Sequence, residues 1–181
     1  MAPYLQKKLV ELCGFDKEQK WKLKYRGTID GFKASDFHGK CDGIANTLTV
    51  IKADNGNIFG GYAEKEWNSR EEDITDPSAF IFSLRNMDAN PFKMVCPSGG
   101  QFSISCQANC GPIIGGDVDE SFRNLYLVII SDSNTEKGSF CDFEYAYQHP
   151  DYLQETPKAN SILAGIKYFQ AEEIEVFTKI H

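Results

Sequence analysis

TLTVIKADNGNIFGGY, residues 47–62, carries the clearest secondary-structure signal in this chain of 181 residues. Apolar side chains alternate around Leu48 and again around Ile58, as they do along half-buried strands. Between the two runs, the dipeptide Asn55-Gly56 accepts the positive φ angles that a type I′ turn requires. The segment therefore predicts a β-hairpin.

Further strand-like runs follow, and no long helical pattern separates them. They cover residues 79–84, 92–96, 101–106, 124–130 and 174–180. Polar stretches at residues 64–76 and 131–138 are expected to be exposed connections. We therefore expect a mainly β (α+β) fold, namely a two-sheet antiparallel β-sandwich with short flanking helices.

An amphipathic helix is expected at the N-terminus. Leu5, Leu9 and Leu12 recur with helical spacing over residues 3–13, and Gly14 is suited to end the helix. The expected organisation is an N-terminal amphipathic helix with its linker over residues 1–20 and one domain over residues 21–181.

A second short helix is expected further along the chain. Ser35 and Asp36 are typical of the first residues of a helix, and Asp42-Gly43 is typical of its end.

The composition and the charge of the chain exclude several classes of protein and of partner. Hydrophobic residues make up 41% and charged residues 25%, which is typical of one globular domain and excludes disordered and fibrous classes. The net charge is −7, and residues 41–181 hold ten Lys/Arg against twenty-one Asp/Glu, whereas residues 1–40 hold nine against five. Acidic surfaces repel phosphate groups, so we expect no nucleic-acid partner.

The apolar runs are all too short to cross a membrane, so we expect no membrane insertion. MAPYLQKKLVELCGF at residues 1–15 lacks the uninterrupted hydrophobic stretch of a signal peptide, and we expect a cytoplasmic location. The six cysteines allow three disulfides, but in a reducing compartment free thiols that pack as small hydrophobes are the simpler expectation. They are Cys13, Cys41, Cys96, Cys106, Cys110 and Cys141.

The sequence lacks the common nucleotide, metalloprotease and hydrolase motifs, and no cofactor is expected. GPIIGG at residues 111–116 has no Lys, Ser or Thr after it to meet a phosphate, so it is expected to form a close-packed turn. Residues 117–128 imitate an EF-hand loop but have Phe122 where the bend needs Gly, which excludes that motif. A looser cation site and a solvated acidic turn are the alternatives for Asp117, Asp119 and Glu120.

His38 and Cys41 stand three residues apart on the second expected helix, a spacing that could join a thiolate to an imidazole. Cys106 and Cys110 could complete a zinc site if the fold brought them close. The structural alternative is that His38 hydrogen-bonds near the helix end while Cys41 packs inward.

YRGTIDGFKASDFHGKCDGIANTLTVIKADNGNIFGGYAEKEW, residues 25–67, resembles the TLDc domain of oxidation resistance proteins and their nuclear receptor coactivator relatives. AFIFSL, GPIIGG and LAGIKYFQAEEIEVF at residues 163–177 resemble later parts of the same domain in the same order. The resemblance implies a two-sheet antiparallel sandwich, a link to oxidative-stress protection, and binding to the vacuolar-type proton ATPase. It implies no catalytic residues.

The matched motifs supply candidate residues. The family-motif glycines are expected to serve folding, with Gly60 and Gly61 at a strand end and Gly165 in the turn before the last strand; they are Gly31, Gly60, Gly61 and Gly165. The polar members are the candidates for a partner surface, with buried hydrogen bonds as the alternative for two of them, Asp30 and Asp42. These candidates are Asp30, His38, Asp42, Glu173 and Glu175.

Three functions are therefore compared. The leading hypothesis is a non-catalytic protein-interaction domain of TLDc type that binds a cytosolic partner, with the vacuolar-type proton ATPase as the expected one. The first alternative is a thiol-based redox enzyme or scavenger that uses Cys41 and His38. The second is a β-sandwich that binds a ligand with the help of a cation. The sequence does not define an oligomeric state.

Overall fold

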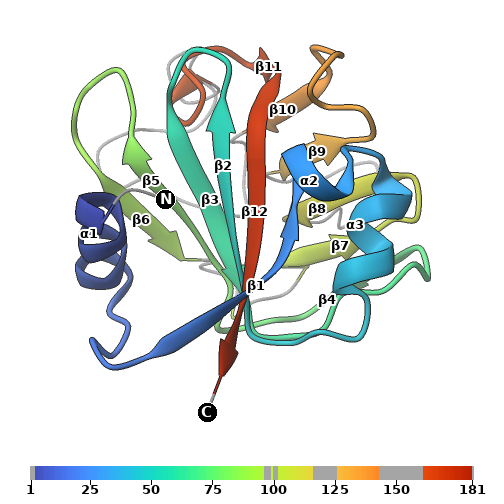
Figure 1. Ribbon diagram of the computed structural model, residues 1–181, viewed down its shortest axis with the longest axis horizontal. Coiled ribbons are helices and arrows are strands. Elements are labelled where there is room, and N and C mark those ends of the chain that lie inside the picture. The colour runs from blue at the N-terminus through green and yellow to red at the C-terminus, as the bar shows by residue number, and fades with distance from the viewer. Residues whose placement is uncertain (1–2, 96–98, 100–101, 116–125, 143–160, 181) are drawn as a thin grey trace.

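The computed structural model describes residues 3–95, 99, 102–115, 126–142 and 161–180 (Figure 1). Its helices are α1 (Pro3–Cys13), α2 (Gly27–Asp30) and α3 (Ala34–Cys41). Its strands are β1 (Lys20–Arg26), β2 (Thr47–Ala53), β3 (Ile58–Ala63), β4 (Glu72–Ile74), β5 (Phe80–Arg85), β6 (Phe92–Val95), β7 (Ile104–Cys106), β8 (Cys110–Ile114), β9 (Tyr126–Ile130), β10 (Ser139–Asp142), β11 (Tyr168–Phe169) and β12 (Ala171–Ile180).

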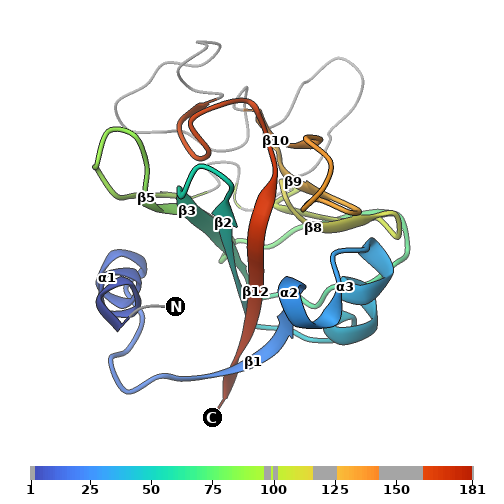
Figure 2. The ribbon, with the colours of Figure 1, turned by 45° about the horizontal axis from the view of Figure 1, so that its top comes forward.

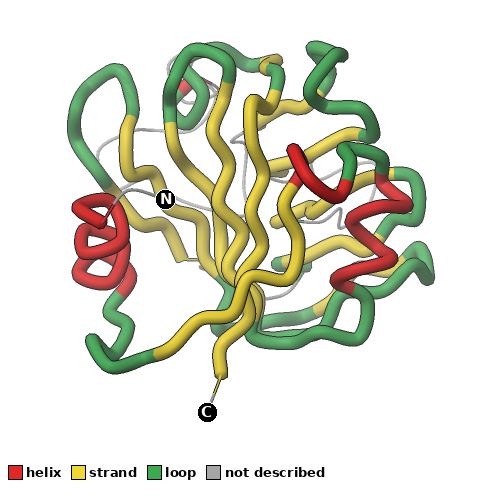
Figure 3. The backbone as a smooth tube through the Cα atoms, viewed as in Figure 1, coloured by secondary structure: helices red, strands yellow, loops and turns green. Residues whose placement is uncertain are grey.

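In the described part of the chain these strands form two six-stranded sheets, with the orders β1-β12-β2-β3-β5-β6 and β11-β10-β9-β8-β7-β4. Neighbouring strands in both sheets run antiparallel. The two sheets face each other, with α1 beside one sheet and α2 and α3 near the other end of the molecule (Figures 2 and 3). The expected antiparallel β-sandwich is confirmed.

The hairpin of β2 and β3 is confirmed, but its turn is not of type I′. The Gly56 N–H donates to the Ala53 carbonyl (2.9 Å), and the Ala53 N–H donates to the Asn57 carbonyl (3.0 Å). Gly56 has φ 86°, whereas Asn55 is not among the residues with positive φ. This pattern is a three-residue loop in which a type I turn is followed by a left-handed glycine. The Asn55 side chain instead accepts a hydrogen bond from the Asn57 N–H (3.1 Å).

The main core lies between the two sheets, because alternate residues of each strand point inward. Phe59 of β3 meets Phe169 of β11 edge to face, with 5.1 Å between ring centroids. Trp67, from the loop after β3, is fully buried and donates its indole N–H to the Thr47 hydroxyl (2.8 Å). The Trp67 ring therefore adds apolar packing to the core, and the hydrogen bond to Thr47 compensates for the water that its indole N–H loses on burial.

Gly60 and Gly61 lie in the middle of β3, not at a strand end as the sequence suggested. A Cβ on Gly60 would lie 2.0 Å from the Thr49 carbonyl oxygen, and a Cβ on Gly61 would lie 2.2 Å from the Ile114 side chain of the other sheet. Both glycines therefore allow a close approach of neighbouring chain segments.

A second core covers the outer face of the first sheet beneath α1. Leu9 and Cys13 of α1 are buried there with Phe80 and Phe82 of β5. The Lys93 ammonium donates to the Cys13 carbonyl (3.1 Å) and lies 4.0 Å from the Phe80 ring centroid. This contact satisfies a carbonyl at the helix C-terminus and holds α1 on the β5–β6 side. The predicted helix over residues 3–13 is confirmed, while the domain boundary at residue 20 stays a prediction.

Several local expectations were wrong. GPIIGG does not form a turn, because its first part is strand β8. The stretch 64–76 is not simply exposed, since it contains strand β4 and the buried Asp76, whose carboxylate accepts hydrogen bonds from the N–H groups of Glu64 (2.7 Å) and Lys65 (3.0 Å). Helix α3 begins one residue earlier than Ser35, and the Asp36 carboxylate accepts from the Lys33 N–H (3.0 Å) instead.

None of the described helices has the length and apolar character needed to cross a membrane. The cysteines whose placement is described are free thiols, and Cys96 lies outside the described residues.

Candidate functional site

Helix α2 forms a single turn between strand β1 and helix α3. Tyr25, buried at the end of β1, donates its hydroxyl to the Gly31 carbonyl (2.7 Å). Gly31 has φ 108°, a conformation that favours glycine, and a Cβ there would lie 2.1 Å from the Asp36 carboxylate. The chain therefore turns sharply after α2, and α2 is fixed against both neighbouring elements.

Charged and polar side chains tie α2 to strand β12. The guanidinium Nε of Arg26 donates to the Glu175 carboxylate at 3.0 Å. The Thr28 hydroxyl and N–H donate to the two carboxylate oxygens of Glu173 at 2.5 and 3.1 Å. On the other side, the Lys40 ammonium of α3 lies 2.8 Å from the Asp30 carboxylate. We call this surface the α2 platform, defined as Arg26, Thr28, Ile29, Asp30, Lys40, Glu173 and Glu175.

The charges of the α2 platform are held in defined positions. The hydrogen bond from Lys40, followed by the bond from the Arg26 N–H (2.8 Å), lowers the pKa of Asp30 below its ordinary value. Ile29, between these polar residues, leaves 72% of its surface exposed. Ile29 therefore presents an apolar side chain to solvent within a frame of paired charges.

His38 and Asp42 form a separate group at the end of α3. The His38 Nδ1 lies 2.7 Å from the Asp42 carboxylate, and its Nε2 lies 3.0 Å from the carbonyl oxygens of Gln107 and Cys110. All three partners are hydrogen-bond acceptors, so both ring nitrogens of His38 lie within hydrogen-bond distance of an acceptor. The other Asp42 oxygen accepts from the Ser69 hydroxyl (2.7 Å). This group joins α3 to strand β8 and to the loop after β3.

Cys41 does not pair with His38, because both ring nitrogens of His38 are already bound elsewhere. Burial, helped by the nearby Asp42 and Asp30 carboxylates, raises the pKa of Cys41 to about 12. Burial also raises the pKa of Cys13 to about 12 and of Cys106 to about 11. Half-buried Cys110 has a raised pKa for the same reason. Such thiols stay protonated at neutral pH, which is the opposite of an activated nucleophile.

No group of His, Cys, Asp and Glu suited to a metal ion occurs in the described ranges, so the zinc set of His38, Cys41, Cys106 and Cys110 does not form. The acidic turn with Asp117, Asp119 and Glu120 lies outside the described residues.

The structure separates the predicted interaction residues into two groups. Asp30, Glu173 and Glu175 meet at the α2 platform, whereas buried His38 and its partner Asp42 serve contacts within the domain. Gly165 has φ 80° in the turn that precedes β11. The remaining members of the platform were not predicted from the sequence; they are Arg26, Thr28, Ile29 and Lys40.

Comparisons with known proteins agree with this architecture. The family model of the TLDc domain matches residues 1–179. MTOR-associated protein MEAK7 of Xenopus laevis is 27% identical over 70 residues, which are 39% of this chain and 15% of the length of that protein. The family match takes in both sheets, α1 and the α2 platform. The chain therefore belongs to the TLDc domain family.

Proposed function

We propose that this TLDc domain is a non-catalytic docking module that binds a cytoplasmic protein partner through the α2 platform. The observation that carries the proposal is Ile29, whose side chain is 72% exposed beside paired charges. Apolar contacts supply most of the affinity at protein interfaces, and fixed surrounding charges supply orientation and specificity. Because Thr28 and Asp30 are held by Glu173 and Lys40, the platform loses little conformational entropy on binding.

The proposed partner is the vacuolar-type proton ATPase, and this choice rests on what is known of TLDc proteins. We attribute the link to oxidative-stress protection to that partner, since Cys41, the candidate reactive thiol, is buried and its raised pKa keeps it protonated at neutral pH. The same burial argues against the thiol-enzyme alternative. The name of the Xenopus relative describes an association with MTOR, so MTOR is the second partner to test.

A direct binding experiment tests this proposal. The purified catalytic sector and peripheral stalk of the ATPase are immobilised, and the dissociation constant of the domain is measured by interferometry. Ile29→Asp should weaken binding by at least about tenfold, because it places a charge at the apolar contact. Met87→Asp is the matched control, since Met87 is 78% exposed in the loop between β5 and β6. Equal loss in both variants contradicts the assigned surface, and no binding of the wild-type domain contradicts the assigned partner.

A further inference from the structure

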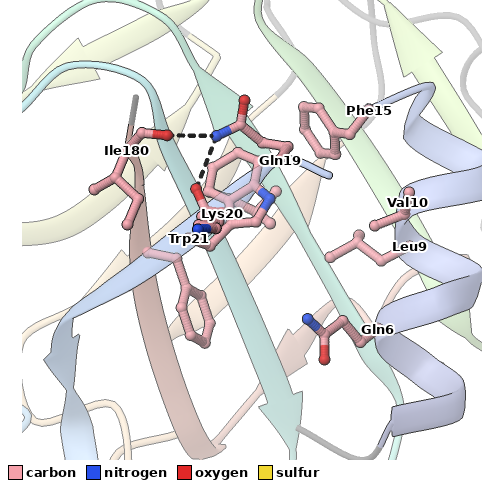
Figure 4. Close-up of a pocket in the computed structure, with 10 residues that line it drawn as sticks. Gln6, Leu9, Val10, Phe15, Gln19, Lys20, Trp21 and Ile180 are labelled. Atoms are coloured by element: carbon pink, nitrogen blue, oxygen red, sulfur yellow. Dashed lines mark hydrogen bonds between the residues drawn. The ribbon is translucent and has the colours of Figure 1, made fainter. Parts of the chain in front are cut away.

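A pocket of about 480 Å³ lies between α1 and the β1–β12–β2 side of the first sheet (Figure 4). Leu48 of β2 and Phe177 of β12 belong to the sheet side of the pocket, and Leu9 points into it from the helix. Phe15 and Gln19 lie together at one end, where the Gln19 amide donates to the carbonyls of Lys20 (2.8 Å) and Ile180 (2.9 Å). The complete lining is Gln6, Leu9, Val10, Phe15, Gln19, Lys20, Trp21, Leu48, Phe177 and Ile180.

The pocket exists because α1 covers only part of the outer face. Lys93 fixes the helix end on the β5–β6 side, and Phe15 packs edge-on against Trp21 at 4.9 Å between centroids. The helix lies against β5 and β6, and Phe177 on β12 stays only partly buried. The hollow is therefore a built feature of the fold, and its volume is within the range of small-molecule sites.

Among the described residues, the lining is mostly apolar, with the amides of Gln6 and Gln19, one cation (Lys20) and no Asp or Glu side chain. Lys20 has no ion-pair partner within the described part of the chain. An adjoining hollow shares Gln6 and Val10 with the pocket and adds Lys7, Lys17 and Glu11. Residues 1–26 carry seven Lys/Arg against three Asp/Glu in a chain whose net charge is −7. The field at this pocket therefore attracts anions, unlike the field of the remaining chain.

We propose that this pocket binds a single-chain aliphatic carboxylate, with the tail against Leu48 and Phe177 and the carboxylate at Lys20. A carboxylate is ionised at neutral pH and complements the positive charge of Lys20, while the apolar lining complements the tail. A pocket of about 480 Å³ is the size of a small-molecule site, whereas a partner helix with its side chains is about 10–12 Å across and needs a long open groove. The site is independent of the α2 platform and of the function proposed for it.

The fluorescence of Trp21 reports whether a ligand binds in the pocket. The chain has two tryptophans, and Trp67 is buried between the sheets, so a ligand in the pocket changes only the Trp21 emission. Decanoate is titrated below its micelle concentration, with decanol as the uncharged comparator. We expect saturable one-to-one binding of decanoate. Lys20→Gln should weaken the binding of decanoate by about threefold to fivefold, as expected for the loss of an exposed ion pair. It should leave the binding of decanol unchanged.

Two variants and one alternative ligand complete the experiment. Lys22→Gln changes a lysine of the same strand that does not line the pocket, and it should leave decanoate binding unchanged. Val10→Phe places a larger side chain in the pocket from α1 and should weaken the binding of decanoate and decanol equally. No saturable response, equal effects of the two lysine variants, or binding only to vesicles of phosphatidylserine and phosphatidylcholine would each overturn the proposal.

Discussion

The carboxylate of Glu173 on strand β12 accepts two hydrogen bonds from Thr28 on helix α2, one from the hydroxyl (2.5 Å) and one from the backbone N–H (3.1 Å). The two residues are 145 positions apart in the chain. The backbone N–H groups of a helical first turn have no partner within the helix, so this carboxylate supplies one from another element. Glu173 thereby fixes the position of Ile29, the next residue.

Replacement of Glu173 by Ala should lower the free energy of unfolding by about 1 kcal/mol, because the Thr28 N–H and hydroxyl lose their acceptor. Within the described residues, the neighbouring Glu172 makes an exposed ion pair with Lys52, so Glu172→Ala should cost less than about 0.5 kcal/mol. Urea denaturation at pH 7 measures both values. A larger effect at Glu172 than at Glu173 would show that the structural contact is not formed in solution.

The stabilisation from Asp30 should depend on pH. Its pKa is lowered in the folded state, so the ionised form is favoured by folding, and this contribution is complete above the unfolded pKa of about 4. Asp30→Asn should therefore cost about 1 kcal/mol at pH 7, and the difference from wild type should shrink as the pH falls below about 4. Urea denaturation across this range measures it. Asp73→Asn, on exposed strand β4, is the control, and an equal pH dependence there would contradict the role of Asp30.

Alanine at two glycines should have opposite effects. Gly60→Ala places a Cβ 2.0 Å from the Thr49 carbonyl oxygen inside the sheet and should destabilise the fold by about 3 kcal/mol. Gly39 lies in α3, where a Cβ would have no neighbouring atom within 4 Å, so Gly39→Ala should stabilise the protein by about 0.5–1 kcal/mol. Thermal unfolding followed by circular dichroism compares the two. A neutral Gly60→Ala variant would mean that β2 and β3 are further apart than described.

Alkylation should find Cys41 unreactive in the folded protein. Its raised pKa of about 12 leaves a thiolate fraction about a thousandfold smaller than that of a free thiol, and the side chain is fully buried. Half-buried Cys110 should react faster than Cys41. Iodoacetamide labelling at pH 8, followed by peptide mass spectrometry, gives each rate. Labelling of Cys41 as fast as Cys110 without unfolding would restore the thiol-enzyme hypothesis.

Regular alternation made much of the sandwich predictable. β2, β3, β5 and β9 are rich in β-branched and aromatic residues, and their positions follow from local pattern. Strand β1 was not predicted because its lysines make KWKLKYR strongly polar, although Trp21, Leu23 and Tyr25 alternate with them. β8 was missed because Gly and Pro suggested a turn.

The candidate site was only partly predictable for a different reason. Glu175 reaches Arg26 only because β12 pairs with β1, and these residues are 149 positions apart. The local pattern of apolar and polar residues does not predict which distant strands pair with each other. The sequence also does not show that an apolar residue such as Ile29 is exposed, since most isoleucines are buried.

Hydrogen exchange of the domain, alone and bound to the purified ATPase sector, tests the docking proposal most directly. It reports which backbone amides become protected when the partner binds. We predict added protection over residues 26–31 and 172–176, with residues 86–90 unchanged. Protection confined to other segments, with α2 exchanging at the same rate in both states, would contradict the claim that the α2 platform is the docking surface.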